Sequence, residues 1–148
     1  MADRTRGYAH RIDILAPSER VWLSLIDPRR LAEWYVPGVR LSPRQGGGVR
    51  IRLDASLERE AMIDVFEPGR RLRLIYLPMP AMPPTEAVLV DDFIISREGE
   101  AAVLRLLGSG FPVSTDWDQL YARLRGGWGV ALSRLKLTVE AQVKPAAK

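Results

Sequence analysis

Few side chains in this sequence have the types and the spacing that chemistry requires. The 148 residues include one histidine, His10, and no cysteine, which excludes thiol catalysis, disulfide bonds and metal sites built on several histidines or cysteines. His10 lies on the apolar face of an alternating segment, and no acid–base partner for it can be identified. A hydrogen-bonded core histidine is therefore favoured over a catalyst. We find no nucleophile–base pattern, and we expect no catalytic residue, no metal and no cofactor.

Two adjacent carboxylates, Asp91 and Asp92, fall in the middle of a predicted strand. Because side chains alternate across a strand, one of them can point inward, where Arg59 or Tyr76 could supply the partner that a buried carboxylate needs. The cost of burying a charge favours the alternative that the carboxylate lies near the open end of the sheet and is solvated. If the protein is an enzyme, its acid or base is expected among His10, Tyr76 and Asp92.

The composition is that of an ordinary globular domain, with 47% hydrophobic and 27% charged residues. We expect one domain over residues 1–148, with an ordered core at 8–140 and a frayed tail at 141–148. The net charge of +4 comes from arginines interleaved with acidic residues, so no nucleic-acid partner is expected. No apolar run approaches the roughly 20 residues that span a bilayer. These patterns predict a cytoplasmic protein, a monomer or homodimer, that does not act at a membrane.

Hydrophobic periodicity divides the chain into short elements. The predicted elements are a strand at 8–16, short helices at 17–26 and 28–35, and strands at 49–54, 57–66, 71–78, 87–96 and 101–111. Asp27-Pro28 separates the two helices, and a bulge near Ile63 would explain the ambiguous facing of its strand. The segment 78–86 is rich in proline and contains two methionines, which predicts an irregular loop that gates or flanks a cavity.

From Thr115 the apolar spacing becomes helical, which predicts one long C-terminal helix. Gly126, Gly127 and Gly129 interrupt this pattern and indicate a kink or a close approach to another part of the chain. Consecutive hairpins imply an antiparallel sheet, and this helix is long enough to cover it. The predicted fold class is α+β: a curved antiparallel sheet of about six to seven strands, two short helices after the first strand, and a long C-terminal helix packed across the concave face.

Four stretches carry a resemblance to a known family. They are "IDILAPSERVWLSLIDPRRLAEWYVP" (12–37), "VFEPGRRLRL" (65–74), "LRLLGSGF" (104–111) and "GWGVALSRLKLTVE" (127–140). With the order of elements, they resemble the START-like, helix-grip superfamily, which includes the birch-pollen-allergen-like proteins. The most similar family in it is the one named for the activator of the 90-kDa heat-shock chaperone ATPase. The resemblance implies a cavity between sheet and long helix, a role in the stress response and, as one alternative, a chaperone partner.

The resemblance also implies that the two short helices form a V that closes one end of the cavity, with Trp34 at its mouth. The alternative for Trp34 is a core tryptophan that joins these helices to the sheet, and Trp128 on the long helix has the same two interpretations. The ligand-binding residues expected on this basis are Trp34, Tyr35, Tyr76, Leu124, Trp128, Leu132 and His10.

The function expected first is binding of a small apolar ligand, lipid-like or aromatic, between the sheet and the C-terminal helix. Two alternatives stay open. One is a cyclase- or hydrolase-type enzyme that uses the same cavity, and the other is a chaperone-interacting regulator of ATPase activity that works through its surface. A cavity above about 300 Å³ favours ligand binding or catalysis, whereas a filled interior favours the regulator.

Overall fold

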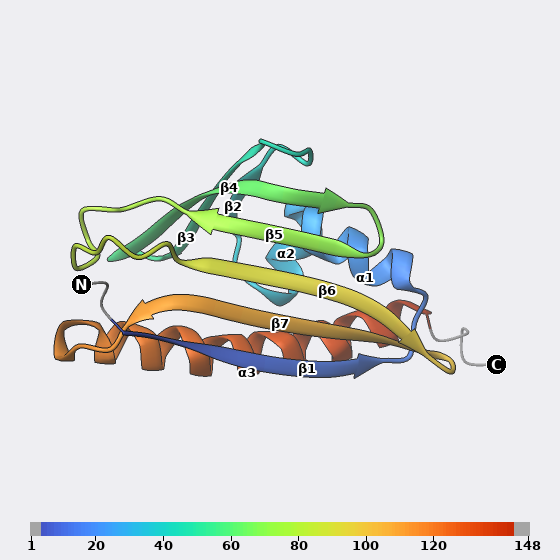
Figure 1. Ribbon diagram of the computed structural model, residues 1–148. Helices are drawn as coiled ribbons and strands as arrows, with labels where there is room; N and C mark the ends of the chain where they lie inside the picture. The colour runs from blue at the N-terminus through green and yellow to red at the C-terminus, as the bar shows by residue number, and fades with distance from the viewer. Residues whose placement is uncertain (1–3, 144–148) are drawn as a thin grey trace.

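The computed structural model describes residues 4–143, which form one curved sheet with three helices against it (Figure 1). The strands are β1 (Thr5–Ile14), β2 (Gly38–Leu41), β3 (Gly48–Asp54), β4 (Leu57–Glu67), β5 (Arg71–Tyr76), β6 (Val90–Glu98) and β7 (Ala101–Pro112). The helices are α1 (Ser18–Ile26), α2 (Pro28–Trp34) and α3 (Thr115–Val143). Neighbouring strands pair antiparallel in the order β1-β7-β6-β5-β4-β3-β2. The predicted α+β fold class is confirmed.

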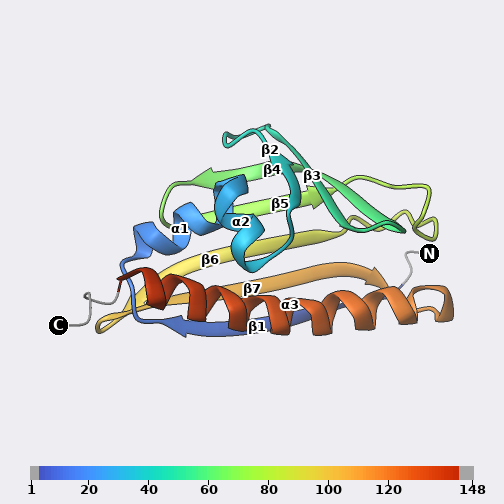
Figure 2. The ribbon, with the colours of Figure 1, turned by 180° about the vertical axis from the view of Figure 1, so that it is seen from behind.

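The helices share one face of the sheet, with α3 in front of β1 and β7 and with α1 and α2 over the rest (Figure 2). Every second side chain of a strand points toward them, as in β5, where Leu72, Leu74 and Tyr76 are buried. The core therefore lies between sheet and helices. Of the tail expected at 141–148, residues up to Val143 are helical, and the others lie outside the described residues.

The corner between α1 and α2 is fixed by a proline and two hydrogen bonds. Pro28 opens α2, where its missing N–H costs nothing, and Asp27 Oδ1 accepts a hydrogen bond from the Arg29 N–H at 3.0 Å. At the other end of α2, Trp34 Nε1 donates to the Ser24 carbonyl of α1 at 2.9 Å. Trp34 is only 2% exposed, so it joins the two helices as a core residue.

β4 carries the bulge that its sequence predicts, because its register against β5 shifts between Ile63 and Val65. Before the bulge, alternate side chains of β4 point into the interior, and one of them, Arg59, is charged. This alternation places a guanidinium among apolar neighbours.

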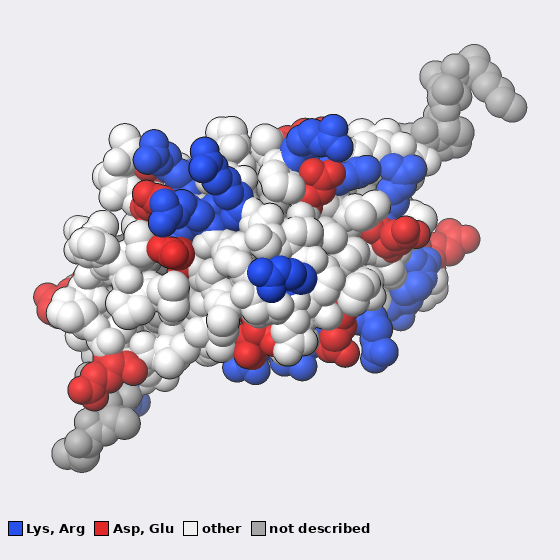
Figure 3. All heavy atoms as spheres, turned by 90° about the horizontal axis from the view of Figure 1, so that it is seen from above, with Lys and Arg blue, Asp and Glu red and all other residues white. Residues whose placement is uncertain are grey.

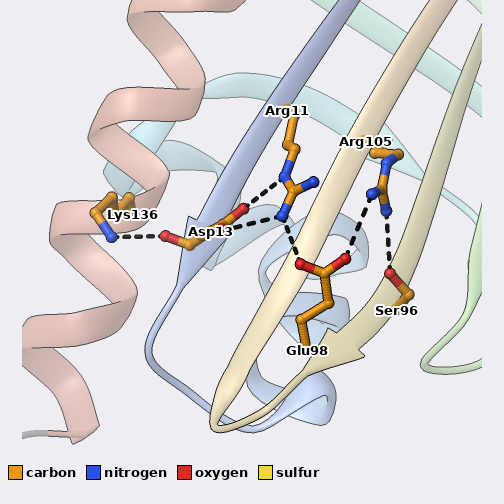
Figure 4. A network of polar contacts seen from close by, with 6 residues as sticks. All are labelled: Arg11, Asp13, Ser96, Glu98, Arg105 and Lys136. Atoms are coloured by element: carbon orange, nitrogen blue, oxygen red, sulfur yellow. Dashed lines mark hydrogen bonds and ion pairs between the residues drawn. The ribbon is translucent and has the colours of Figure 1, made fainter.

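An exposed polar network ties β1 and the β6–β7 hairpin to α3 (Figure 4). Arg11 bonds to Asp13 at 2.9 Å and to Glu98 at 2.6 Å, and Arg105 lies 3.8 Å from the same glutamate. Lys136 of α3 donates to the Asp13 carbonyl at 2.6 Å. Because water screens these charges, the network contributes little to the stability of the fold.

Charged side chains of both signs share the face seen in Figure 3, where acidic groups lie among the basic ones. On the outer side of β2 and β3, Arg40 pairs across the strands with Arg50. The like charges are offset on β4, since Arg50 lies 3.3 Å from Glu58 and 3.4 Å from Glu60.

α3 runs without interruption through the three glycines that suggested a kink. A Cβ added at Gly126 or Gly127 would meet no atom within 4 Å, so close packing does not require these glycines. A Cβ at Gly129 would lie 3.6 Å from His10 Cε1, an ordinary contact. The interpretation of a close approach is therefore wrong at Gly126 and Gly127.

Gly126→Ala is expected to raise the free energy of unfolding by about 1 kcal/mol, because alanine loses less backbone entropy in a helix. Urea denaturation measures this change in the free energy of unfolding. Gly69→Ala is the matched control, since Gly69 also has open space around it but sits in a turn at φ +77, where a Cβ is strained and stability should fall. A loss of stability in Gly126→Ala would show that the native helix unwinds at this point.

Candidate ligand-binding site

A small apolar cavity of about 30 Å³ lies between α2, the β2–β5 half of the sheet and α3. Its lining consists of Leu25, Leu31, Trp34, Tyr35, Val39, Leu41, Val49, Ile51, Ile63, Leu72, Leu74, Phe93 and Trp128. This volume is about that of one water molecule, far below the roughly 300 Å³ at which small-molecule sites begin. In this conformation the interior is nearly filled.

A second hollow, an open groove of about 310 Å³, lies on the other side of the same wall. It runs between the end of α2, the end of β3 and the middle of α3. The groove is lined by Tyr35, Val36, Leu53, Arg123, Leu124, Gly127, Trp128, Val130, Ala131 and Arg134. Its floor is mostly apolar, and two arginines stand at its rim.

The wall between cavity and groove is a pair of stacked rings, since Tyr35 and Trp128 line both. Their ring centroids are 4.7 Å apart and their planes meet at 13°. Trp34 continues the stack at 5.4 Å from Tyr35, and Phe93 meets Trp128 edge-on at 5.4 Å. Tyr35 follows the last residue of α2, and its N–H donates a hydrogen bond to the Leu31 carbonyl at 2.8 Å.

Asp91 points into the core, where the sequence interpretation favoured a solvated carboxylate, and that interpretation is wrong. Tyr8 donates to Asp91 Oδ1 at 2.6 Å and Tyr76 donates to Oδ2 at 2.7 Å. Nη1 of Arg59 lies 3.7 Å from Oδ2, and the guanidinium carbon stands 3.6 Å from the centre of the Tyr76 ring. Arg59 and Tyr76 are the partners that the sequence suggested for an inward carboxylate, whereas Tyr8 was missed. Together with Asp91, these three residues form the Asp91 cluster.

Gly108 explains how Tyr8 reaches Asp91 across the sheet. On β7, Gly108 pairs with Tyr8 on one side and with Asp91 on the other. A Cβ at this position would lie 2.3 Å from Tyr8 Cε1, so only glycine leaves room for the ring. Gly108, the first residue of "GSG", is therefore a structural requirement of the buried cluster.

Burial and the Asp91 charge raise the pKa of Tyr8. Burial also raises the pKa of Tyr76 well above its usual value, although the Arg59 charge opposes this, and the pKa of Tyr35 shifts upward for the same reasons. Each hydroxyl is thus held in its neutral form.

Alkaline pH is therefore expected to unfold the protein. A tyrosine whose pKa is raised by folding contributes stability that is complete below the unfolded pKa of about 10 and is lost as pH rises above it. The free energy of unfolding, measured by urea denaturation, should fall as pH rises above about 10. The fall should be less steep in Tyr8→Phe than in the wild type. Tyrosinate absorbance from the buried rings should appear only with unfolding. Its gradual appearance in protein with a native circular dichroism spectrum would contradict this account.

The predicted site residues separate into two groups. Trp34, Tyr35 and Trp128 line the cavity. Tyr35 and Trp128 also line the groove, together with Leu124. The others line neither hollow: they are Tyr76 in the Asp91 cluster, Leu132 in the core, and His10.

His10 is half-buried beside Tyr8, with ring centroids 5.6 Å apart, and its Nε2 has no hydrogen-bond partner within residues 4–143. Asp92, a candidate acid or base, points to the opposite face of the sheet from Asp91. There it holds Arg71 by two hydrogen bonds of 3.0 and 2.8 Å. Asp92 therefore cannot act in the cavity.

The proline-rich segment 78–86 is irregular as predicted but lines neither hollow, so its expected role in gating or flanking the cavity is not supported. Met82 is buried in the core. Pro84 and Thr85 lie beside the first turn of α3, near Asp116 and Trp117.

Within residues 4–143, no three histidine, aspartate or glutamate side chains come together as a metal ion would require. Among the same residues, no helix combines the length and the apolar character needed to span a bilayer.

Residues 15–140 match the family described as "Activator of Hsp90 ATPase homolog 1-like protein". No curated protein is similar enough in sequence to count as a relative. The crystal structure of MLL2253 from Mesorhizobium loti is similar at a TM-score of 0.81 and 21% identity, covering 95% of this chain and 100% of that one. The solution structure of the Aha1 dimer from Colwellia psychrerythraea is similar at a TM-score of 0.78 and 18% identity, covering 94% of this chain and 99% of that one.

CalU16 from Micromonospora echinospora is similar at a TM-score of 0.71 and 23% identity, covering 95% of this chain and 84% of that one. At these identities, structural similarity shows the fold alone. The sequence match covers most of the chain and agrees with the curved sheet, the paired short helices and the long C-terminal helix. This chain therefore belongs to the family of activator of Hsp90 ATPase homolog 1-like proteins.

Proposed function

We propose that this protein binds a small, mainly apolar molecule, which rests in the groove and extends into the interior when Tyr35 and Trp128 move apart. The observation that supports this most is that one stacked ring pair is the shared wall of an outer groove and an inner apolar cavity. A stack of two rings can separate by side-chain rotation, without breaking the sheet or α3.

The volumes indicate that the two hollows would work together. The cavity of about 30 Å³ is too small for an organic ligand, and the groove of about 310 Å³ stands at the lower end of the usual range. Gly126 and Gly127 follow Leu124 on this part of α3 and have open space around them, which leaves room for the helix to adjust.

Titration with an environment-sensitive apolar dye tests the proposal. Ile63→Phe fills the cavity and should weaken dye binding by about tenfold, equivalent to about 1.4 kcal/mol. Met62→Phe is the matched control, because Met62 is the adjacent residue, is 41% exposed and lines neither hollow, so binding should be unchanged. Equal affinities for the two variants, or no binding by the wild type, would contradict the proposal.

A chaperone-interacting regulator is the second candidate, supported by the family match and by the nearly filled interior. Native mass spectrometry of the purified protein separates the candidates. A co-purified apolar molecule supports ligand binding. An empty protein that also fails to bind the dye, but raises the ATPase rate of an added Hsp90-type chaperone, supports the regulator. The enzyme alternative has little support, because the cavity lining is apolar or aromatic, and because the Asp91 carboxylate already accepts hydrogen bonds from Tyr8 and Tyr76 and is not part of that lining.

A further inference from the structure

Arg59 is a buried group whose hydrogen-bonding capacity the fold leaves unused. Its side chain is 0% exposed, and Nε, Nη1 and Nη2 have no hydrogen-bond partner within residues 4–143. The 3.7 Å between Nη1 and Asp91 Oδ2 suits an ion pair but is too long for a hydrogen bond. A guanidinium carries five N–H donors, and a buried donor without an acceptor destabilises the protein.

Asp91 does not supply the missing acceptors, because Nη1 of Arg59 lies 3.7 Å from its Oδ2, beyond hydrogen-bond distance. Tyr8 and Tyr76 each donate one short hydrogen bond to its two oxygens. The Arg59 charge is thus balanced by the Asp91 carboxylate and by the Tyr76 ring beneath it. What the site lacks is a hydrogen-bond acceptor rather than a second negative charge.

Arg59 lines neither hollow, but residues next to it on the same face of the sheet line both. Its cross-strand partner, Ile51 on β3, lines the cavity, and Leu53, two residues along the same face, lines the groove. Tyr35, in the wall between the two hollows, is close enough that the Arg59 charge opposes the effect of burial on its pKa. An opening of the ring pair would therefore bring a ligand next to the guanidinium.

We propose that the ligand carries a neutral acceptor oxygen, such as a ketone carbonyl, on its apolar body, and that this oxygen accepts hydrogen bonds from Arg59. The inference rests on the proposed function and specifies its ligand class. A purely apolar ligand would leave the guanidinium donors unpaired. A carboxylate fits less well, because Asp91 already neutralises Arg59 and would repel a second anion.

Three probes of similar shape test this inference by titration: 2-acetylnaphthalene, 2-isopropylnaphthalene and 2-naphthoate. The ketone should bind the wild type about tenfold more tightly than the hydrocarbon, and the carboxylate should bind no more tightly than the hydrocarbon. Arg59→Met should remove the advantage of the ketone and leave hydrocarbon binding unchanged. Arg52→Met is the matched control and should keep the advantage, because Arg52 is exposed on the outer face of β3 and lines neither hollow.

Infrared spectroscopy of a ¹³C-labelled ketone gives a readout that needs no variant, in case Arg59→Met does not fold. The carbonyl stretch of the ketone bound to wild-type protein should lie at lower frequency than in hexane, as hydrogen bonding to a cation requires. Equal ketone and hydrocarbon affinities, an unshifted carbonyl, or an advantage lost in Arg52→Met would overturn the inference. Failure of all three probes to bind would instead contradict the proposed function.

Discussion

Asp91→Ala is expected to lower the free energy of unfolding by about 3–5 kcal/mol, because it leaves the Arg59 charge buried without its counter-ion. The same change removes the acceptor of the Tyr8 and Tyr76 hydroxyls, both of which are buried. Urea denaturation at neutral pH measures the effect. Part of the loss should return in the double variant Asp91→Ala/Arg59→Met, where no unpaired charge remains.

Asp92→Ala is the control for this prediction, because it removes the same chemical group one residue further along β6. Asp92 pairs with Arg71 on the outer face, where its side chain is 14% exposed and that of Arg71 36%. Its loss should therefore cost no more than about 1 kcal/mol. Similar losses for the two variants would show that the Asp91 cluster does not hold the interior together.

The fold could be predicted because it depends on local patterns. Alternation predicts the inward side chains of β3 and β5, and a break in it predicts the bulge near Ile63. The change to helical spacing predicts the start of α3 at Thr115. The corner at Asp27-Pro28 follows from the chemistry of the two residues alone.

The buried cluster could not be predicted in full because it depends on register between distant strands. Tyr8 and Asp91 are 83 positions apart in the chain and meet only because both pair with Gly108. A signal was available in Gly108 itself, since a glycine inside a strand often marks a place where another group approaches closely. The strand order β1-β7-β6 is needed to identify the residue that approaches Gly108.

The extent of the cavity also escapes prediction from the sequence, because side-chain rotamers decide it. The sequence predicts that Trp34, Tyr35 and Trp128 gather at the same place, and they do. It does not predict that Tyr35 and Trp128 stack at 4.7 Å and divide the space into a filled interior and an outer groove. Periodicity specifies the face on which a ring lies, whereas its χ angles depend on every neighbour.

Trp128→Ala is expected to lower the free energy of unfolding by about 3 kcal/mol, the lower end of the range for a buried tryptophan. Trp128 is 4% exposed and is held by Tyr35 and Phe93, but it borders the cavity and the groove and so has fewer packing partners than a ring in a solid core. Removing the ring also removes half of the wall. Stopped-flow mixing with the dye should therefore show faster association, while loss of the ring contact weakens the complex.

Trp22→Ala separates these effects from a general loosening of the fold. Trp22 is equally buried at 4% exposure and packs edge-on against Phe66 at 5.1 Å, but it lines neither hollow. Its truncation should cost about 3–5 kcal/mol and leave the dye association rate unchanged. If both variants speed association equally, the change reflects destabilisation and Trp128 is an ordinary core residue. If only Trp128→Ala does so, the ring pair controls access to the interior.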